Sequence, residues 1–340
     1  MERNGITGAG IFVIDHVKIV NLWPEQGMLS LILDERKANG GCGYNVLKDL
    51  AKLETNIPLT AVGITGNDED GKYIFKDLKE HNIDTSLMYV IDDAVTSYTD
   101  VITVKDTGVR TFFYNKGASK FLDIKHFDFD LINSKILHIG YILVLDSLDE
   151  FDSEYGTRMA RLLKIAKDHG IKTSVDLVSE SSDRFSKIVP PALRYTDYLI
   201  VNEIEAGKTT GLKIREENGS INSENLKKSL DILIENGNSE LVCIHFPEGA
   251  YATLRDGNPL FIPSHDLPAG FIKGTVGAGD AYCAGMLYGL HENWDLEKCM
   301  RLAGAMAAIC LTEPSTSDGM KPLSETLEFM KKMPLRNFKI

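Results

Sequence analysis

A short segment of this sequence, residues 274–280, combines residue types that suit the binding of an anion. Gly277, Ala278 and Gly279 precede, with Asp280 in between, an apolar run of small residues that predicts a helix. Their backbone N–H groups would lie at the N-terminus of that helix, where unpaired donors and the helix dipole attract phosphate oxygens. Asp280 stands in the same turn. The alternative interpretation is a tight structural turn in which Asp280 favours the dipole.

A second glycine-rich segment, residues 40–45, also precedes a helix-like run. It ends at Asn45, and Asp15 follows the apolar run 11–14 near the N-terminus. Carboxylate and amide side chains suit a polyol, because together they offer hydrogen-bond acceptors and donors. The alternatives are a strand-to-helix turn with Asn45 as its cap, and Asp15 as a simple strand-end residue.

Hard oxygen ligands occur in a third place, directly after the apolar run 198–201. Asn202 and Glu205 are three residues apart, so a helix beginning at residue 203 would carry them on one side. Magnesium keeps several waters and accepts only one or two protein groups, so such sparse ligation is enough. A helix cap made by Asn202 is the alternative interpretation.

The elements that must position these residues follow a β-α-β alternation, which is typical of an α/β fold with parallel strands covered by helices. The expected strands are residues 10–15, 59–63, 136–139, 173–176, 198–202 and 241–245. The expected helices are residues 42–53, 70–81, 153–169, one from 203, 223–235, 278–291, 296–311 and 324–332.

Two stretches interrupt this alternation, residues 17–33 and 86–116. In the second, residues 98–104 and 110–114 flank the turn 105–108 and predict a hairpin. Strands inserted into a β-α-β chain cannot all join the main sheet without awkward crossovers, so we expect a small separate sheet that acts as a lid. No linker rich in Pro, Gly or Ser divides the chain, which predicts a single domain over residues 1–340.

Composition excludes several classes of function. The formal net charge is −12, and no stripe of Lys and Arg interleaved with aromatic residues is present, so nucleic-acid binding is not expected. No apolar run reaches the roughly 18 residues of a membrane span, which favours a cytoplasmic protein without membrane contact. The five cysteines are scattered and form no C-x-x-C pair, so free thiols are expected.

Taken together, these motifs resemble those of the ribokinase-like (PfkB) carbohydrate kinases over nearly the whole chain. The resemblance implies a ribokinase-like three-layer α/β/α domain with a mainly parallel central sheet and a small β-sheet lid. It also implies ATP and Mg²⁺ as cofactors and a sugar or polyol hydroxyl as acceptor. Asp280 would be the base, and the amides of Gly277, Ala278 and Gly279 the anion hole. Asn202 and Glu205 match the family's N-x-x-E motif and would hold the metal through water.

The same resemblance assigns residues to the substrate and the nucleotide. Gly41, Asn45 and Asp15 would contact sugar hydroxyls. Arg110, on the lid, could pair with a carboxylate or phosphate of the substrate. On the nucleotide side, Thr275 and Gly249 would join Asn202 and Glu205.

Departures from the family pattern leave the substrate undecided. Cys42 and Tyr44 stand where ribokinases have lysine and alanine, so a 2-keto-3-deoxygluconate kinase and a nucleoside kinase remain alternatives on the same fold. Gly274 stands where relatives have the aspartate of a monovalent-cation site, so a requirement for potassium is open.

Other functional classes and the oligomeric state can also be considered from the sequence. A nucleotide- or sugar-binding regulator without turnover is the alternative from another functional class. A dinucleotide-dependent oxidoreductase is disfavoured, because no G-x-G-x-x-G follows the first expected strand. Exposed edges of the lid sheet could pair across a homodimer.

Overall fold

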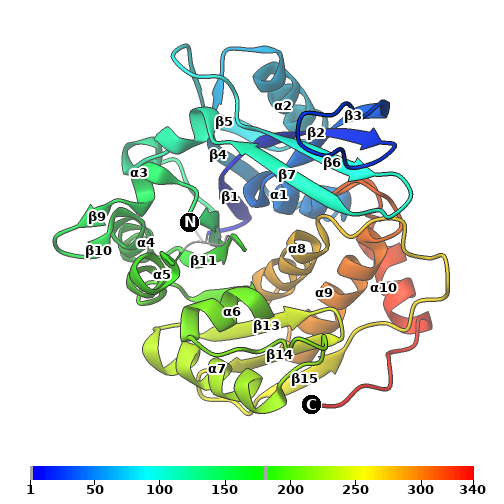
Figure 1. Cartoon of the computed structure of the whole chain (residues 1–340). Helices are drawn as coiled ribbons and strands as arrows, with labels where there is room; N and C mark the ends of the chain where they lie inside the picture. Colours follow the sequence, from blue (N-terminus) through cyan, green and yellow to red (C-terminus); the bar gives the residue numbers. More distant parts are fainter. Residues whose placement is uncertain (1–2, 180–182) are drawn as a thin grey trace.

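A nine-stranded sheet runs through the centre of the protein, in the order β15-β14-β13-β12-β11-β8-β1-β4-β5 (Figure 1). The structure is a computed structural model that describes residues 3–179 and 183–340. The strands from β13 to β5 in this order pair in parallel, and β14 and β15 add an antiparallel edge. The strands of this sheet are β1 (Ile6–Gly10), β4 (Leu59–Gly66), β5 (Asp84–Ile91), β8 (Ile136–Ile142), β11 (Lys172–Leu177), β12 (Tyr198–Asn202), β13 (Leu241–Phe246), β14 (Gly249–Leu254) and β15 (Leu260–Pro263).

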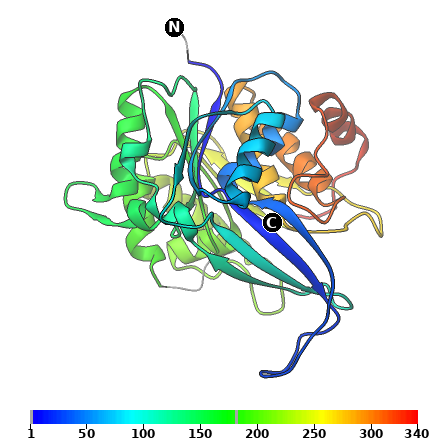
Figure 2. The same ribbon diagram turned by 90° about the horizontal axis from the view of Figure 1, so that it is seen from above.

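Helices cover both faces of this sheet, and Figure 2 shows the two helical layers on either side of it. Each face has its own hydrophobic core, because the helices on that face bury apolar side chains against the strands. On one face lie α1 (Cys42–Lys52), α2 (Glu69–Glu80), α8 (Ala278–His291), α9 (Leu296–Cys310) and α10 (Leu323–Lys332). On the other lie α3 (Asp146–Asp149), α4 (Arg158–Asp168), α5 (Phe185–Leu193), α6 (Glu203–Thr210) and α7 (Ser223–Asn236).

A separate four-stranded sheet projects from the body of the protein (Figure 2), as expected for the lid. Its order is β3-β2-β6-β7; the central pair is parallel, and the outer pairs are antiparallel. Its strands are β2 (Val13–Val20), β3 (Ile32–Gly40), β6 (Tyr98–Val104) and β7 (Arg110–Asn115). The expected lid boundary at residue 86 is wrong, because residues up to 91 belong to β5 at the edge of the main sheet.

Two expected elements also differ from the structure. The run 10–15 is not one strand: β1 ends at Gly10 and β2 begins at Val13. Gly10 has a φ of 120°, and a Cβ there would lie 1.8 Å from the carbonyl oxygen of Gly140, so the chain leaves the main sheet at a position that only glycine can occupy.

The helix expected over residues 153–169 begins only at Arg158. Before it, β9 (Phe151–Asp152) and β10 (Gly156–Thr157) form a short hairpin. The Asp152 carboxylate accepts a hydrogen bond from the backbone amide of Tyr155 and holds the turn. Thr157 then caps α4 by accepting the amide of Ala160 at 3.1 Å.

The five cysteines are free, as expected from their spacing, and the structure shows that all five are buried. Among the helices described, none combines the length and the apolar character that crossing a membrane requires.

Candidate active site

Polar side chains gather where the parallel strands of the main sheet end. Tyr141 lies near the end of β8, Asp176 near the end of β11, and Asn202 closes β12. Ligands of open α/β sheets bind at this carboxyl edge of the strands. Helix α8 begins at the same edge and brings Asp280 to it, since Tyr141 contacts Asp280 directly.

The turn before α8 has the geometry of an anion site. Gly277 caps the helix with a φ of 83°, and a Cβ there would lie 2.5 Å from the carbonyl oxygen of Thr316. The amide of Ala281 donates to the Gly277 carbonyl at 2.8 Å and begins the helical ladder. The preceding amides, those of Ala278, Gly279 and Asp280, have no acceptor within that ladder. They stand at the positive end of the helix dipole.

Asp280 is buried and oriented by two side chains. Its Oδ2 accepts a hydrogen bond from Asn45 Nδ2 at 2.7 Å, and its Oδ1 accepts one from the Tyr141 hydroxyl at 3.1 Å. Burial raises the pKa of Asp280, while the hydrogen bonds from Asn45, Tyr141 and Cys42 oppose that rise. The result is a carboxylate that is a stronger base than an exposed aspartate and that has a defined direction.

Other buried acids lie beside Asp280. Ligand atoms of Asp176, Cys42 and Asp280 are all within 4.8 Å of one another. Burial raises the pKa of Asp176 well above its usual range, and the charges of Glu205 and Asp280 raise it further. Burial likewise raises the pKa of Glu205 to about 7. In this group the carboxylates of Asp176 and Asp280 offer the oxygen ligands that a divalent cation such as Mg²⁺ prefers.

Asn202 and Glu205 form a capping box at the start of α6. Asn202 Oδ1 accepts the amides of Ile204 and Glu205, both at 2.9 Å, and Glu205 Oε2 accepts the amide of Asn202 at 3.0 Å. The Ser179 hydroxyl donates to Glu205 Oε1 at 2.8 Å. The cap considered from the sequence is therefore formed, and a contact with metal through water stays a prediction.

A cavity of about 750 Å³ lies between the lid and the loops that precede α8 and follow α9. Asp15, from β2, lines it, and Gly40 leaves room for that carboxylate because a Cβ there would lie 2.6 Å from Asp15 Oδ1. Burial raises the pKa of Asp15 to about 7, while a hydrogen bond from Thr99 lowers it and the charge of Asp280 raises it. Gly41, which caps α1 with a φ of 86°, and Asn45 are not among the residues that line this cavity.

Two arginines from different lid strands line the same cavity, Arg36 of β3 and Arg110 of β7. Arg110 Nη1 is buried and has no hydrogen-bond partner. Burial lowers the pKa of Arg110, the neighbouring charge of Arg36 lowers it further, and Asp15 partly opposes this. The cavity therefore carries an excess of positive charge on its lid side. Sequence reasoning missed Arg36, because its place opposite Arg110 depends on the pairing order of the lid strands.

A second, mainly apolar cavity of about 440 Å³ lies over α8 and α9. Thr275 lines both cavities, so they adjoin at the loop before α8. Gly249 follows the two-residue turn between β13 and β14, and a Cβ there would lie 2.5 Å from the carbonyl oxygen of Ile262. The predicted residues that line this cavity are Asn202, Gly249, Thr275, Ala278 and Gly279.

Gly274 lies against the loop after α9. A Cβ at this position would lie 2.6 Å from Pro314 Cα and 2.9 Å from the carbonyl oxygen of Glu313. The backbone amide of Lys273 also donates to the Leu311 carbonyl at 2.8 Å. The two loops are thus packed backbone against backbone, which leaves no room for a side chain at position 274.

The chain is similar in sequence and in fold to kinases of small molecules. The family model described as pfkB family carbohydrate kinase matches residues 9–322. The 5-dehydro-2-deoxygluconokinase of Clostridium perfringens is 24% identical over 304 residues, which cover 86% of this chain and 84% of that protein. The nucleoside kinase of Methanocaldococcus jannaschii is 24% identical over 332 residues, or 98% of each chain.

Among solved structures, that of Arabidopsis thaliana ribokinase complexed with ribose and ATP superposes with a TM-score of 0.79. The two chains are 20% identical, and the superposition covers 97% of this chain and 99% of the other. This similarity confirms the ribokinase-like fold that the sequence predicts.

Proposed function

Because the chain belongs to the pfkB family of carbohydrate kinases and is a phosphotransferase that acts on a sugar hydroxyl, we propose that ATP is the donor and Asp280 the base. The observation that carries this proposal is the position of Asp280: it is buried, oriented by two donors, and lies in the first turn of α8 together with the unpaired amides of that turn. The acceptor hydroxyl would lie in the larger cavity and ATP in the smaller one. The two cavities adjoin at Thr275.

In this mechanism Asp280 aligns the hydroxyl and takes its proton late. Phosphoryl transfer passes through a loose transition state, so a carboxylate need not create a free alkoxide. The amides of Gly277, Ala278 and Gly279 stabilise charge on the migrating group, and one such donor is typically worth about 3 kcal/mol. Mg²⁺, held by Asn202 and Glu205 through water, would neutralise charge on the phosphates.

Two substitutions test the base. Asp280→Asn and Asp280→Ala should lower kcat by about 10³-fold or more, since both remove proton acceptance and hydroxyl alignment together. Nucleotide binding by calorimetry should remain, because the amides and the apolar cavity are unchanged. Asp149→Asn is the matched control: Asp149 is also a buried carboxylate, with its pKa raised by burial to about 7, but it bonds the backbone of Leu143. Substantial turnover in both Asp280 variants would contradict the proposal.

The same measurements of turnover and nucleotide binding distinguish the alternatives from other functional classes. A regulator without turnover would bind nucleotide and release no ADP with any polyol. A dinucleotide-dependent oxidoreductase is set aside, because the family is one of kinases.

A second candidate, an acidic sugar as substrate, is favoured by one observation. The unpartnered Nη1 of Arg110 and the nearby guanidinium of Arg36 make the lid side of the cavity positive. A neutral ribose does not use that charge, whereas the carboxylate of a keto-deoxy sugar acid does. The relative from Clostridium perfringens, named 5-dehydro-2-deoxygluconokinase, supports this direction. The nucleoside kinase relative keeps a nucleoside acceptor as the remaining alternative.

A further inference from the structure

Two buried side chains, those of Asn45 and Asn39, connect Asp280 to Lys48, which lies one turn after Asn45 in α1. Lys48 Nζ donates to Asn39 Oδ1 at 3.1 Å, and Asn39 Nδ2 donates to Asn45 Oδ1 at 2.7 Å. Asn45 Nδ2 then donates to Asp280 Oδ2 at 2.7 Å. Each of the four residues is between 2% and 6% exposed. We call this series, Lys48, Asn39, Asn45 and Asp280, the amide chain.

The amide chain has one direction, and its two ends determine it. An ammonium group only donates hydrogen bonds and an ionised carboxylate only accepts them. Lys48 therefore requires the carbonyl end of Asn39, which leaves the Asn39 amide nitrogen to face Asn45. Asn45 must therefore accept the hydrogen bond from Asn39 with its side-chain oxygen, and its side-chain nitrogen then donates to Asp280. Reversal of either amide would set donor against donor or acceptor against acceptor.

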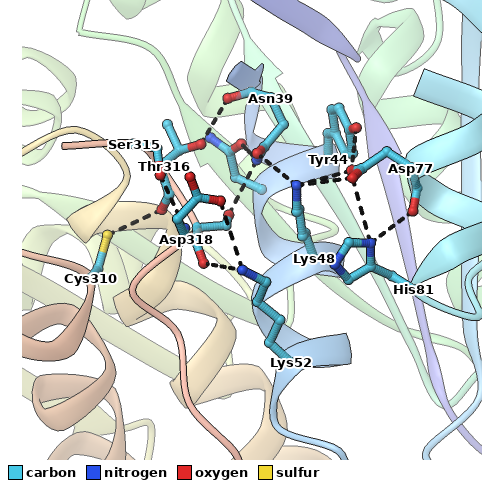
Figure 3. Close-up of polar contacts among 12 residues, drawn as sticks. Asn39, Tyr44, Lys48, Lys52, Asp77, His81, Cys310, Ser315, Thr316 and Asp318 are labelled. Carbon is cyan, nitrogen blue, oxygen red and sulfur yellow. Dashed lines mark hydrogen bonds and ion pairs between the residues drawn. The ribbon is translucent and has the colours of Figure 1, made fainter. Parts of the chain in front are cut away.

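Lys48 is held in place from its other side by α2. Its Nζ lies 3.1 Å and 3.2 Å from the two carboxylate oxygens of Asp77, and the Tyr44 hydroxyl donates to Asp77 at 2.5 Å. Figure 3 shows Lys48 between Asn39 and Asp77, with His81 beside that carboxylate. The anchor of the amide chain is therefore an ion pair between two helices of the same layer.

The amide chain also touches the loop after α9. Asn39 Nδ2 makes a longer contact of 3.2 Å with the Ser317 hydroxyl, and the Thr316 hydroxyl donates to the backbone carbonyl of Asn39 at 2.8 Å. The backbone of Thr316 lies against Gly277 at the anion site. Asn39 thus contacts both Asn45, which orients Asp280, and Thr316, which lies against the turn before α8.

We infer that Lys48 and Asn39 are positioning residues for phosphoryl transfer: they fix the direction of the Asn45 amide, and this amide in turn orients Asp280 and favours its ionised form. The inference rests on the proposed role of Asp280 as the base. Neither residue touches the substrate cavity, so both act through Asn45. Connected hydrogen bonds in a dry interior polarise one another, which lets the charge of Lys48 act at the carboxylate.

Asn39→Asp tests the direction without a change of size. A carboxylate at position 39 satisfies Lys48 but cannot donate to Asn45. The Asn45 amide then turns its nitrogen towards position 39 and presents its carbonyl to Asp280. We expect kcat to fall roughly 10- to 100-fold, as for a small misplacement of a reacting group, while KM for sugar and for ATP stays within about twofold. The melting temperature should change little, because Lys48 keeps an acceptor.

Lys48 variants provide an independent test. Lys48→Met should lower kcat to a similar extent, and Lys48→Arg, which still only donates, should restore most of it. Lys52→Met is the matched control, since Lys52 lies one turn further along α1 and contacts the Ser317 carbonyl at 2.9 Å without touching Asn39. Melting temperatures separate a loss of stability from a loss of turnover.

The outcomes separate this inference from the function on which it rests. Wild-type kcat in Asn39→Asp and Lys48→Met, together with an inactive Asp280→Asn, would overturn the inference alone. Equal losses in Lys48→Met and Lys52→Met would also overturn it, since the effect would then be structural. An active Asp280→Asn would overturn the assignment of the base itself.

Discussion

At the scale of single residues, Asn45 shows how one amide can serve two purposes. Its motif predicts a contact with sugar hydroxyls, which stays a prediction. In the structure both ends of its side chain are engaged by protein groups, one by Asn39 and one by Asp280. A sugar that binds beside Asp280 would therefore meet an amide that is already oriented.

Arg110 leads to a prediction about the substrate. Arg110→Gln should lower kcat/KM for an acidic sugar by roughly 10- to 100-fold, because a hydrogen bond between two charged groups is worth about 1.5–3 kcal/mol. Neutral sugars should lose much less. The measurement is substrate-dependent ADP release over a panel of sugars with and without a carboxylate. Arg194→Gln, at an exposed arginine that ends α5, is the control. An equal loss for neutral and acidic sugars would contradict a carboxylate partner.

The sequence predicts the residues of the site that come from local motifs and misses those that tertiary structure adds. Gly277 to Asp280 could be found because glycines before an apolar helix are a local signal. Tyr141 and Arg36 reach the site only through strand pairing and carry no such signal. Asp176 was within reach, since a carboxylate near the end of a buried strand is itself informative.

At the scale of elements, the lid is the part of the fold that the sequence predicts least accurately. Its strands are expected where the sequence lacks a helical periodicity, and this pattern correctly predicts β6 and β7. It could not find the division between β1 and β2, because this depends on the contact of Gly10 with Gly140. Periodicity describes which side of an element is buried, but it contains no information on close approach between distant segments.

The lid also predicts the oligomeric state. Its outer strand β3 and the loop before it expose large apolar side chains, with Leu29 79% and Met28 69% exposed. A second copy of the chain would cover this surface, as exposed edges and apolar patches favour association. We expect a dimer in sedimentation experiments and a monomer for Leu29→Glu.

The control for this experiment is Phe151→Glu. Phe151 is 81% exposed on the hairpin before α4, outside the lid, so this variant should remain dimeric. A monomeric wild-type protein would contradict pairing through the lid, and a monomeric Phe151→Glu would move the interface elsewhere.

At the scale of the whole molecule, the buried acids determine how stability depends on pH. Burial raises the pKa values of Asp15, Asp149 and Glu205 to about 7, whereas in an unfolded chain these groups ionise near 4. Between these values the folded protein retains protons that the unfolded chain has released. The resulting stabilisation is complete at low pH and is lost as pH rises through about 7.

The ligand-free protein should therefore melt at a lower temperature at pH 8.5 than at pH 6, by on the order of 5 °C. Thermal unfolding over this range measures the effect. Asp149→Asn should flatten the dependence, because it removes one of the titrating groups. Asp123→Asn should not, since Arg158 holds the pKa of Asp123 below its usual range. A melting temperature that rises over this range would contradict the argument.

Asn39 is followed by Gly40, and this sequence makes the amide chain sensitive to a slow chemical change of the protein. An asparagine before a glycine is prone to spontaneous deamidation, in which the next backbone nitrogen attacks the side-chain carbonyl and expels ammonia, and water then opens the resulting succinimide to aspartate or isoaspartate. In the folded chain that side chain is buried, with its oxygen bonded to Lys48 and its nitrogen to Asn45. The aspartate product is identical to the Asn39→Asp chain, so ageing of unfolded protein would produce, without any mutation, a fraction of molecules that refold with the Asn45 side-chain amide reversed.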